Sequence, residues 1–226
     1  MSQIIIKNLV KTYKLSNQIL EVLKDVNLTI TAGESVALVG KSGNGKSTLL
    51  NLIAGIDTFE SGSIIVLDKE ISKMNQSEKQ EFLNKSIGFV FQSFYLIPYL
   101  SVSQNVALPI LFSSKNKSNI DKKVHDLLNY VGLLDQKDKF PNQLSGGQIQ
   151  RVAIARSLIN NPKIIFADEP TGNLDEETTN QVLDLLFRIN KEQGTTLIIV
   201  THDKDIAQKC SKSLLVQNKT TSPFYA

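Results

Sequence analysis

The stretch Gly40-Lys41-Ser42-Gly43-Asn44-Gly45-Lys46-Ser47, followed by Thr48, decides the fold of this chain. It matches the pattern G-x-x-x-x-G-K-[ST] at every position. Glycines allow the backbone to approach a ligand closely and to adopt unusual dihedral angles, so successive N–H groups can face one anion. The stretch therefore predicts a loop that binds nucleotide phosphates, with Lys46 at the β- and γ-phosphates and Ser47 as a ligand of Mg²⁺. A glycine-rich turn without a ligand is the alternative.

The residues on either side supply the strand and the helix that such a loop needs. Ser35–Val39 is short, apolar and β-branched, as a buried strand should be. Residues 48–54 predict a helix that ends at Gly55, and the start of that helix adds partial positive charge. This order of strand, loop and helix indicates bound nucleotide phosphates but leaves the reaction open.

The composition is that of an ordinary globular protein. The chain has 226 residues, of which 41% are hydrophobic and 21% charged, enough for one large domain or a core with a subdomain. The formal net charge is +3 and no dense Lys/Arg run accompanies it, so we expect no nucleic-acid partner. Cys210 is the only cysteine, which excludes an internal disulfide. We find no signal-peptide pattern and no run of about 18 apolar residues, so transport would need a separate membrane partner.

Polar side chains follow further strands that the sequence predicts. The apolar runs that predict these strands are residues 87–91, 164–167 and 196–200. Asp168 ends one strand and is suited to hold Mg²⁺, and Glu169 can polarise the water that attacks the γ-phosphate. His202 follows another strand of the same expected parallel sheet, from which its imidazole could reach the γ-phosphate. Gln92 could bind Mg²⁺ or position a water, or be a solvated loop amide.

Residues 93–162 have a different character and predict a helical subdomain inserted into an α/β core. Pro98, Pro109 and Pro141 interrupt the pattern. Apolar residues recur there at helical spacing, at positions 124, 127, 128 and 131. Ahead of this region, Ser77–Gln80 fits a capping box that would open a short helix.

The segment Leu144-Ser145-Gly146-Gly147-Gln148 predicts a second anion-binding surface. Ser145 and Gln148 have the spacing of a capping box. Each glycine in the first turn weakens a helix by about 0.8–1.0 kcal/mol relative to alanine, and a cap alone does not require that cost. An exposed helix start that lets an anion touch its backbone does require glycine. One nucleotide needs only one such cradle from its own subunit. We therefore expect a pair of subunits related by two-fold symmetry, in which each lends this second surface to the nucleotide of the other.

With these motifs in order, the sequence resembles the ATP-binding subunits of ABC transporters from Tyr13 to His202. The resemblance implies a P-loop NTPase (RecA-like) α/β core with a mostly parallel sheet, an N-terminal antiparallel β subdomain and an inserted α-helical subdomain. It implies a single nucleotide-binding domain, with residues 1–92 and 163–226 as the ATP-binding core and 93–162 as the helical subdomain with the signature motif.

The resemblance also implies a role for each matched residue. Tyr13, which on composition alone is as well explained as core or surface filler, would stack on adenine. Residues 40–48 would be the Walker A loop, and Gln92 the Q-loop glutamine that senses Mg²⁺ and the membrane partner. Ser145 and Gly147 would contact the γ-phosphate of the opposite subunit's ATP.

The remaining matched residues complete the expected catalytic set. Asp168 would be the Walker B aspartate and Glu169 the catalytic base. Asp175 would be the D-loop aspartate and His202 the switch histidine. Together these roles imply an ATPase that uses ATP and Mg²⁺ and closes as a homodimer around its nucleotides.

Residues 91–98 and 168–175 resemble a narrower group, which contains macrolide exporters, lipoprotein-releasing systems, antimicrobial-peptide resistance systems and the cell-division ATPase. This implies a permease that docks at the helical subdomain near Gln92, and a cytoplasmic location on the inner face of the cell membrane. Ile149 departs from the usual glutamine. The strand expected at residues 213–216 lacks the usual Asp-Gly turn after it, and no chemistry is assignable to the tail 218–226.

A soluble ABC ATPase without a transporter is the alternative. Such proteins usually carry a long coiled coil, zinc-binding cysteines or two cassettes, and none of these features is present in this sequence. A GTPase switch would need an N-K-x-D motif, which is also absent from the sequence.

Overall fold

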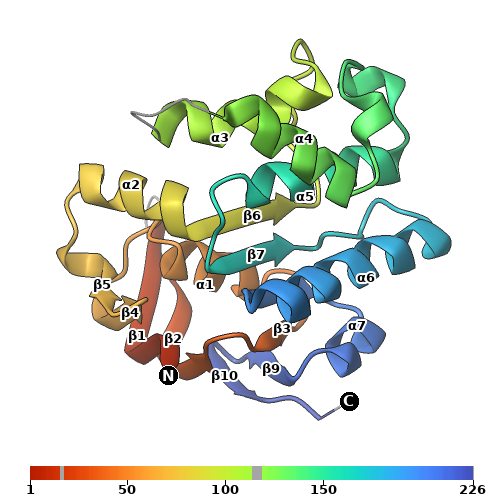
Figure 1. Cartoon of the computed structure of the whole chain (residues 1–226). Coiled ribbons are helices and arrows are strands. Elements are labelled where there is room, and N and C mark those ends of the chain that lie inside the picture. Colours follow the sequence, from red (N-terminus) through yellow and green to blue (C-terminus); the bar gives the residue numbers. More distant parts are fainter. Residues whose placement is uncertain (16–17, 114–118, 226) are drawn as a thin grey trace. The chain divides into compact units, whose positions relative to one another are not determined.

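The computed structural model describes residues 1–15, 18–113 and 119–225, which form two compact units (Figure 1). Unit 1 comprises Met1–Gln80 and Thr196–Ala226, and unit 2 comprises Glu81–Thr195. Within the described ranges, no helix is both long enough and apolar enough to cross a membrane.

An antiparallel sheet forms the N-terminal part of unit 1, in the strand order β2-β1-β4-β5. Its strands are β1 (Ser2–Leu15), β2 (Gln18–Thr31), β4 (Ser61–Val66) and β5 (Lys69–Glu70). The buried face of β2 carries Val26, Leu28 and Ile30, which alternate with exposed residues as the sequence predicts. The expected antiparallel β subdomain is therefore confirmed.

Unit 1 also contains part of a second sheet, in which three strands pair in parallel. Strand β3 (Ser35–Val39) pairs in parallel with β8 (Thr196–Thr201) on one side and with β9 (Lys212–Gln217) on the other. Every residue of β3 is buried, as expected for a central parallel strand. Helix α1 (Lys46–Ile53) follows β3, a 3₁₀ turn (Ile71–Lys73) follows β5, and α7 (Lys204–Lys209) follows β8.

The C-terminal segment forms a hairpin where the sequence suggested only a polar tail. Strand β10 (Thr220–Pro223) pairs antiparallel with β9. Asn218 and Lys219 connect them with φ angles of 50° and 68°. Two consecutive positive φ angles are those of a type I′ turn, so Asn-Lys provides the turn here in place of Asp-Gly.

Unit 2 combines a pair of parallel strands with helices (Figure 1). Strand β6 (Ile87–Phe91) pairs with β7 (Ile164–Asp168). The helices are α3 (Val102–Ser113), α4 (Ile120–Tyr130), α5 (Gly146–Leu158) and α6 (Glu176–Gln193), with 3₁₀ turns at Leu134–Gln136 and Pro141–Gln143. Val124 and Leu128 are buried on α4, as their spacing predicts. The extra helices at 102–158 agree with the expected helical content of this region.

Two local predictions are wrong. Helix α2 (Gln76–Ser86) is opened by the reciprocal bonds Asn75 N to Glu78 Oε2 (2.8 Å) and Glu78 N to Asn75 Oδ1 (3.0 Å), not by a box that starts at Ser77. Pro109 lies inside α3 and does not break it. Burial of Val106 and Ile110 on the same helix stabilises it despite the hydrogen bond that proline removes.

Asn105 on α3 fixes the loop that precedes this helix. Its side chain is fully buried, and Oδ1 accepts a hydrogen bond from Ile97 N (2.8 Å). Nδ2 donates to Leu100 O (2.9 Å) and to Ser101 O (3.0 Å). One side chain thus satisfies backbone groups that would otherwise be buried without partners.

Replacing Asn105 by alanine should therefore destabilise the fold. We expect a loss of about 2 kcal/mol, because several buried backbone groups lose their partner. For a chain of this length, this loss corresponds to a fall in melting temperature of about 4–8 °C. The control is Asn129→Ala, at an exposed position of α4. Equal melting temperatures for the two variants would contradict this assignment.

Candidate functional site

The loop between β3 and α1 presents open backbone at a helix start. Gly45 occupies the N-cap position with φ 90°, and because it has no side chain, the first N–H groups of α1 carry no side-chain cap. Gly43 also has a positive φ of 81°, and a Cβ added there would meet nothing within 4 Å. The predicted loop therefore has the open, left-handed backbone that an anion cradle needs.

Lys46 places a positive charge inside this loop. Its side chain is only 6% exposed, and Nζ donates to Gly40 O (2.8 Å) and to Lys41 O (3.1 Å). The ammonium has three donors, so one remains after these two bonds. A buried cation at the centre of a loop of N–H groups is a strong attraction for phosphate.

Gly40 and Asn44 hold the loop against strand β9. Asn44 Nδ2 donates to Val216 O (3.0 Å), and a Cβ on Gly40 would lie 2.5 Å from the same oxygen. Glycine is thus required at position 40 by this close backbone approach. The structure gives both residues an anchoring role that the motif alone did not indicate.

The register of β3 and β8 brings His202 to the edge of the sheet where the loop begins. Val39 pairs with Thr201, so Gly40 and His202 leave their strands side by side. His202 is exposed. Sequence reasoning placed these residues in one parallel sheet, and within unit 1 this is confirmed.

Tyr13 lies near the end of β1 and is partly exposed. Its hydroxyl donates to Asp57 Oδ2 (2.7 Å), and Lys11 Nζ lies 4.4 Å from the centre of its ring. Partial burial raises the pKa of Tyr13, and the hydrogen bond to the Asp57 carboxylate raises it further. Sequence patterns did not identify Lys11 or Asp57 as partners of Tyr13.

In unit 2, the strand pairing brings the predicted glutamine and carboxylates together. Phe91 pairs with Asp168, so Gln92 and Glu169 follow at the same end of β6 and β7. Gln92 Nε2 donates to Asn173 Oδ1 (3.3 Å), and Asn173 Nδ2 donates to Gln92 O (3.1 Å). The amide of Gln92 is therefore fixed against the loop that follows Glu169.

Glu169 has a strained backbone. Its φ of 45° lies in the left-handed region, which is uncommon for residues other than glycine. Gly172 N donates to Glu169 O (3.1 Å), and the fully buried Gln150 donates from Nε2 to Pro170 O (2.5 Å). Strained backbone conformations cluster at functional sites, where the surrounding contacts hold the residue in that conformation.

The capping box at the start of α5 is confirmed. Gln148 N donates to Ser145 Oγ (3.3 Å), and Ser145 N donates to Gln148 Oε1 (2.9 Å). Ser145 and Gly146 are exposed, whereas Gly147 is buried. A Cβ on Gly147 would clash with Thr178 of α6. Packing therefore requires glycine at this position, whether or not a ligand binds there.

Asp175 caps helix α6. Its Oδ1 accepts from Thr178 N (2.9 Å) and its Oδ2 from Thr178 Oγ1 (2.8 Å). The hydrogen bond from the Thr178 N–H is the main cause that lowers the pKa of Asp175. The acidic residues Glu176 and Glu177 in the first turn are a sequence signal that would have predicted this cap.

Arg156 supports the segment after Gln92, which sequence reasoning did not foresee. Its guanidinium donates from Nη2 to Phe94 O (2.7 Å) and from Nη1 to Tyr95 O (2.5 Å). Phe94 and Tyr95 both have positive φ angles, 60° and 48°. Burial lowers the pKa of Arg156, and the two carbonyl oxygens orient its charge.

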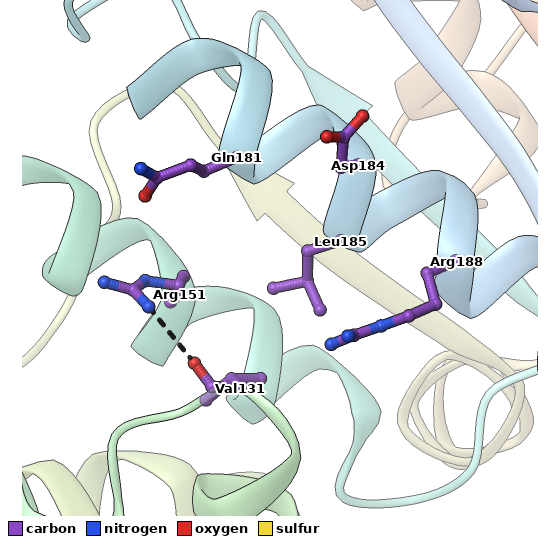
Figure 2. Close-up of a pocket in the computed structure, with 6 residues that line it drawn as sticks. All are labelled: Val131, Arg151, Gln181, Asp184, Leu185 and Arg188. Carbon is purple, nitrogen blue, oxygen red and sulfur yellow. Dashed lines mark hydrogen bonds between the residues drawn. The ribbon is translucent and has the colours of Figure 1, made fainter. Parts of the chain in front are cut away.

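A pocket of about 300 Å³ opens between α4, α5 and α6 (Figure 2). Arg151 Nη1 donates to Val131 O (3.4 Å) and Arg188 Nη2 donates to Tyr130 O (3.1 Å). In Figure 2 both guanidinium groups point toward the end of α4, while Asp184 points away from Arg151. These arginines satisfy the last carbonyls of α4, a structural role that cations often have at a helix C-terminus.

Comparison with known proteins gives a consistent result. Residues 23–172 match the model of the ABC transporter family. An uncharacterized ABC transporter ATP-binding protein of Bacillus subtilis, YvrO, is 43% identical over 94% of this chain and 93% of its own length. Another uncharacterized ABC transporter ATP-binding protein, YbbA of Escherichia coli, is 42% identical over 94% of this chain and 96% of its own length.

Solved structures agree with these relatives. A dimeric structure of a post-hydrolysis state of the ATP-binding cassette MJ0796, bound to ADP and Pi, has a TM-score of 0.88. It is 38% identical and covers 99% of each chain. CbiO1 of Clostridium perfringens, part of the ABC transporter complex cbiONQ, has a TM-score of 0.86 at 34% identity and covers 98% of this chain and 87% of its own. The chain described here therefore belongs to the ABC transporter family, as an ATP-binding and ATP-hydrolysing subunit.

Proposed function

We propose that this ABC ATPase works as a homodimer that encloses two ATP molecules, and that its closure drives a separate membrane permease. The observation that carries the proposal is the exposed helix start at Ser145 and Gly146, a capped N-terminus that supplies a second anion-binding surface. A phosphate loop on one copy and this surface on the other would complete one site. The dimeric structures of MJ0796, one of them with ADP and Pi, support this arrangement.

In the proposed reaction, Tyr13 stacks on the adenine of ATP, as the family resemblance implies, and the following residues act at the phosphates. Lys46 and the N–H groups that follow Gly45 bind the phosphates. Glu169 accepts a proton from the attacking water, and its fixed backbone helps to orient the carboxylate toward that water. His202 reaches the γ-phosphate from the edge where the loop begins. Ser145, with the backbone at Gly147, contacts the same phosphate from the partner copy.

Mg²⁺ accompanies ATP in this proposal, with Ser47, Gln92 and Asp168 as its protein ligands. Their hydroxyl, amide and carboxylate oxygens are the ligand types that Mg²⁺ prefers. Gln92 fits this role because Nε2 donates to Asn173, which leaves Oε1 for a cation. When bound, the ion neutralises charge on the β- and γ-phosphates. Ser47 belongs to unit 1 and the other two residues to unit 2, so the shared site rests on the family's motifs.

The permease is proposed to dock on unit 2 near Gln92. Exposed apolar residues between positions 95 and 112 support this: Tyr99 and Phe112 are 87% and 82% exposed, and Tyr95 and Ile97 are also exposed. Exposed aromatic residues gathered in one part of a chain mark interaction sites. In this proposal the helical subdomain, residues 93–162, lies at the cytoplasmic face of the cell membrane. Resemblance to the exporter and lipoprotein-releasing group favours export, lipoprotein release or mechanical work as the output.

Replacing Glu169 by glutamine should separate binding from hydrolysis. The amide keeps the shape of the side chain but cannot accept a proton, so we expect phosphate release to fall roughly 10²- to 10⁴-fold while ATP still binds. Gel filtration with ATP should show the variant as a trapped dimer. Glu81→Gln, an exposed carboxylate paired with Lys85, is the control and should hydrolyse ATP at the parent rate. Phosphate release by Glu169→Gln at the parent rate would contradict the role proposed for Glu169.

Hydrolysis should depend on association of two copies. On dilution below the dimer dissociation constant, we expect the rate per subunit to fall, because each site then lacks the partner's Ser145 surface. ATP binding to a single copy should persist. A constant rate per subunit down to a concentration at which sedimentation shows only monomer would refute the shared site.

The proposed permease surface is testable with the exposed aromatics of unit 2. Tyr99→Ser and Phe112→Ser should abolish co-purification with an integral membrane protein from detergent-solubilised membranes while leaving basal ATPase activity unchanged. Tyr225→Ser removes a similarly exposed aromatic from unit 1 and should retain the partner. If the unaltered chain is fully active and co-purifies with no membrane protein, the alternative of a soluble, non-transport ABC ATPase gains support.

A further inference from the structure

The segment that follows helix α1 holds the end of strand β1 through several polar contacts. Glu60 N donates to Val10 O (3.1 Å), and Thr12 N donates to Glu60 Oε2 (2.7 Å). A Cβ on Gly62 would lie 2.6 Å from the carbonyl oxygens of Lys7 and Asn8, so the chain passes unusually close to β1. Residues 57–62 and β1 are therefore fixed relative to each other within unit 1.

Asp57 is the centre of this contact. Its Oδ2 accepts from the Tyr13 hydroxyl (2.7 Å), and its Oδ1 accepts from Lys11 Nζ (3.0 Å) and from Thr58 N (2.7 Å). Although partial burial acts to raise the pKa of Asp57, the hydrogen bonds from Tyr13 and Lys11 hold it below its usual value. Asp57 therefore stays ionised and keeps both partners in place.

Lys11 is buried beneath the tyrosine. Its side chain is 5% exposed, and Nζ donates to Thr58 O (2.6 Å) as well as to Asp57. The ammonium also lies over the Tyr13 ring, 4.4 Å from its centre, in a cation–π contact. One face of the ring is thus covered by a cation, and the residue as a whole remains 37% exposed.

The Tyr13 hydroxyl also links the ring to the phosphate-binding helix. Asp57, which accepts from this hydroxyl, follows the C-terminal end of α1, where Ile56 N donates to Asn51 O (3.0 Å). Tyr13 is therefore tied through Asp57 to helix α1, whose start forms part of the phosphate loop.

We propose that Lys11 and Asp57 are positioning residues for the nucleotide base, which fix the Tyr13 ring at a set place relative to the phosphate loop and leave its uncovered face for adenine. This inference rests on the proposed function, in which Tyr13 stacks on adenine. A tyrosine that is already immobilised loses no rotamer freedom when the base stacks on it. The two residues act through Tyr13 and do not touch the nucleotide.

The test compares ATP with inorganic triphosphate, which shares the phosphates but lacks the base. Stacking on an aromatic side chain is worth roughly a 5- to 150-fold change in affinity, so Tyr13→Ala should weaken ATP binding within that range. Lys11→Met and Asp57→Asn should each weaken ATP binding by about three- to tenfold, since the ring is kept but is less well fixed. Calorimetric titration should show that the affinity for inorganic triphosphate is unchanged in all three variants, which also shows that the loop is folded.

Conservative and matched variants separate positioning from general effects. Lys11→Arg keeps a cation over the ring and a donor for Asp57, so it should retain more of the parent affinity for ATP than Lys11→Met does. Lys14→Met removes an exposed lysine from the same strand, and Asp68→Asn alters an exposed carboxylate at a turn of unit 1. Both controls should bind ATP as the parent does.

A double-mutant comparison decides whether the two residues act through Tyr13. In a Tyr13→Ala background, Lys11→Met should weaken ATP binding no further. An additional loss there, or weaker triphosphate binding in Lys11→Met and Asp57→Asn, would overturn the inference. Parent-like ATP binding in these two variants, with Tyr13→Ala weakened, would also overturn it while leaving the stacking role of Tyr13 intact. Parent-like binding in Tyr13→Ala itself would refute the stacking role and the positioning inference together.

Discussion

Parallel strand pairing without offset is the constraint on which the placement of the polar residues depends. In unit 1, Val39 opposite Thr201 sets the start of the phosphate loop beside His202. In unit 2, Phe91 opposite Asp168 sets Gln92 beside Glu169. The paired strands are largely buried and apolar, so charged groups are confined to the points where the strands end. A shift of one residue in either pair would separate these groups and turn buried side chains to the opposite face.

Buried polar contacts then fix the backbone at those strand ends. The left-handed conformation of Glu169 costs on the order of 1–3 kcal/mol and persists only where neighbours enforce it. Gln150 supplies part of that enforcement, because it is fully buried on α5 and its amide donates to Pro170 O. Arg156, which lies further along α5, does the same for the positive-φ residues Phe94 and Tyr95. A single helix in unit 2 therefore supports both the segment after Gln92 and the segment after Glu169.

Local sequence patterns predicted the elements, and contacts distant in sequence could not be predicted. Short apolar runs located β3, β6, β7 and β8 closely, because a buried strand consists of consecutive apolar residues. The capping box at Ser145 followed from a three-residue spacing. By contrast, Lys11 and Asp57 are 46 residues apart, and no periodicity relates them. The prediction that Pro109 interrupts its region was wrong because tertiary burial outweighs the local helix penalty.

The glycines at the start of α5 show how one residue type can have two physical causes. Gly147 allows close packing against Thr178, whose side chain would meet any Cβ at that position. Thr178 cannot simply move aside, because its N–H and hydroxyl are both bonded to Asp175. Anion binding therefore explains glycine only at the exposed position 146, while Gly147 allows the start of α5 to pack against the start of α6. The contact of Gly147 with Thr178, and the hydrogen bonds of Thr178 to Asp175, therefore hold the start of α5 against the cap of α6 within unit 2.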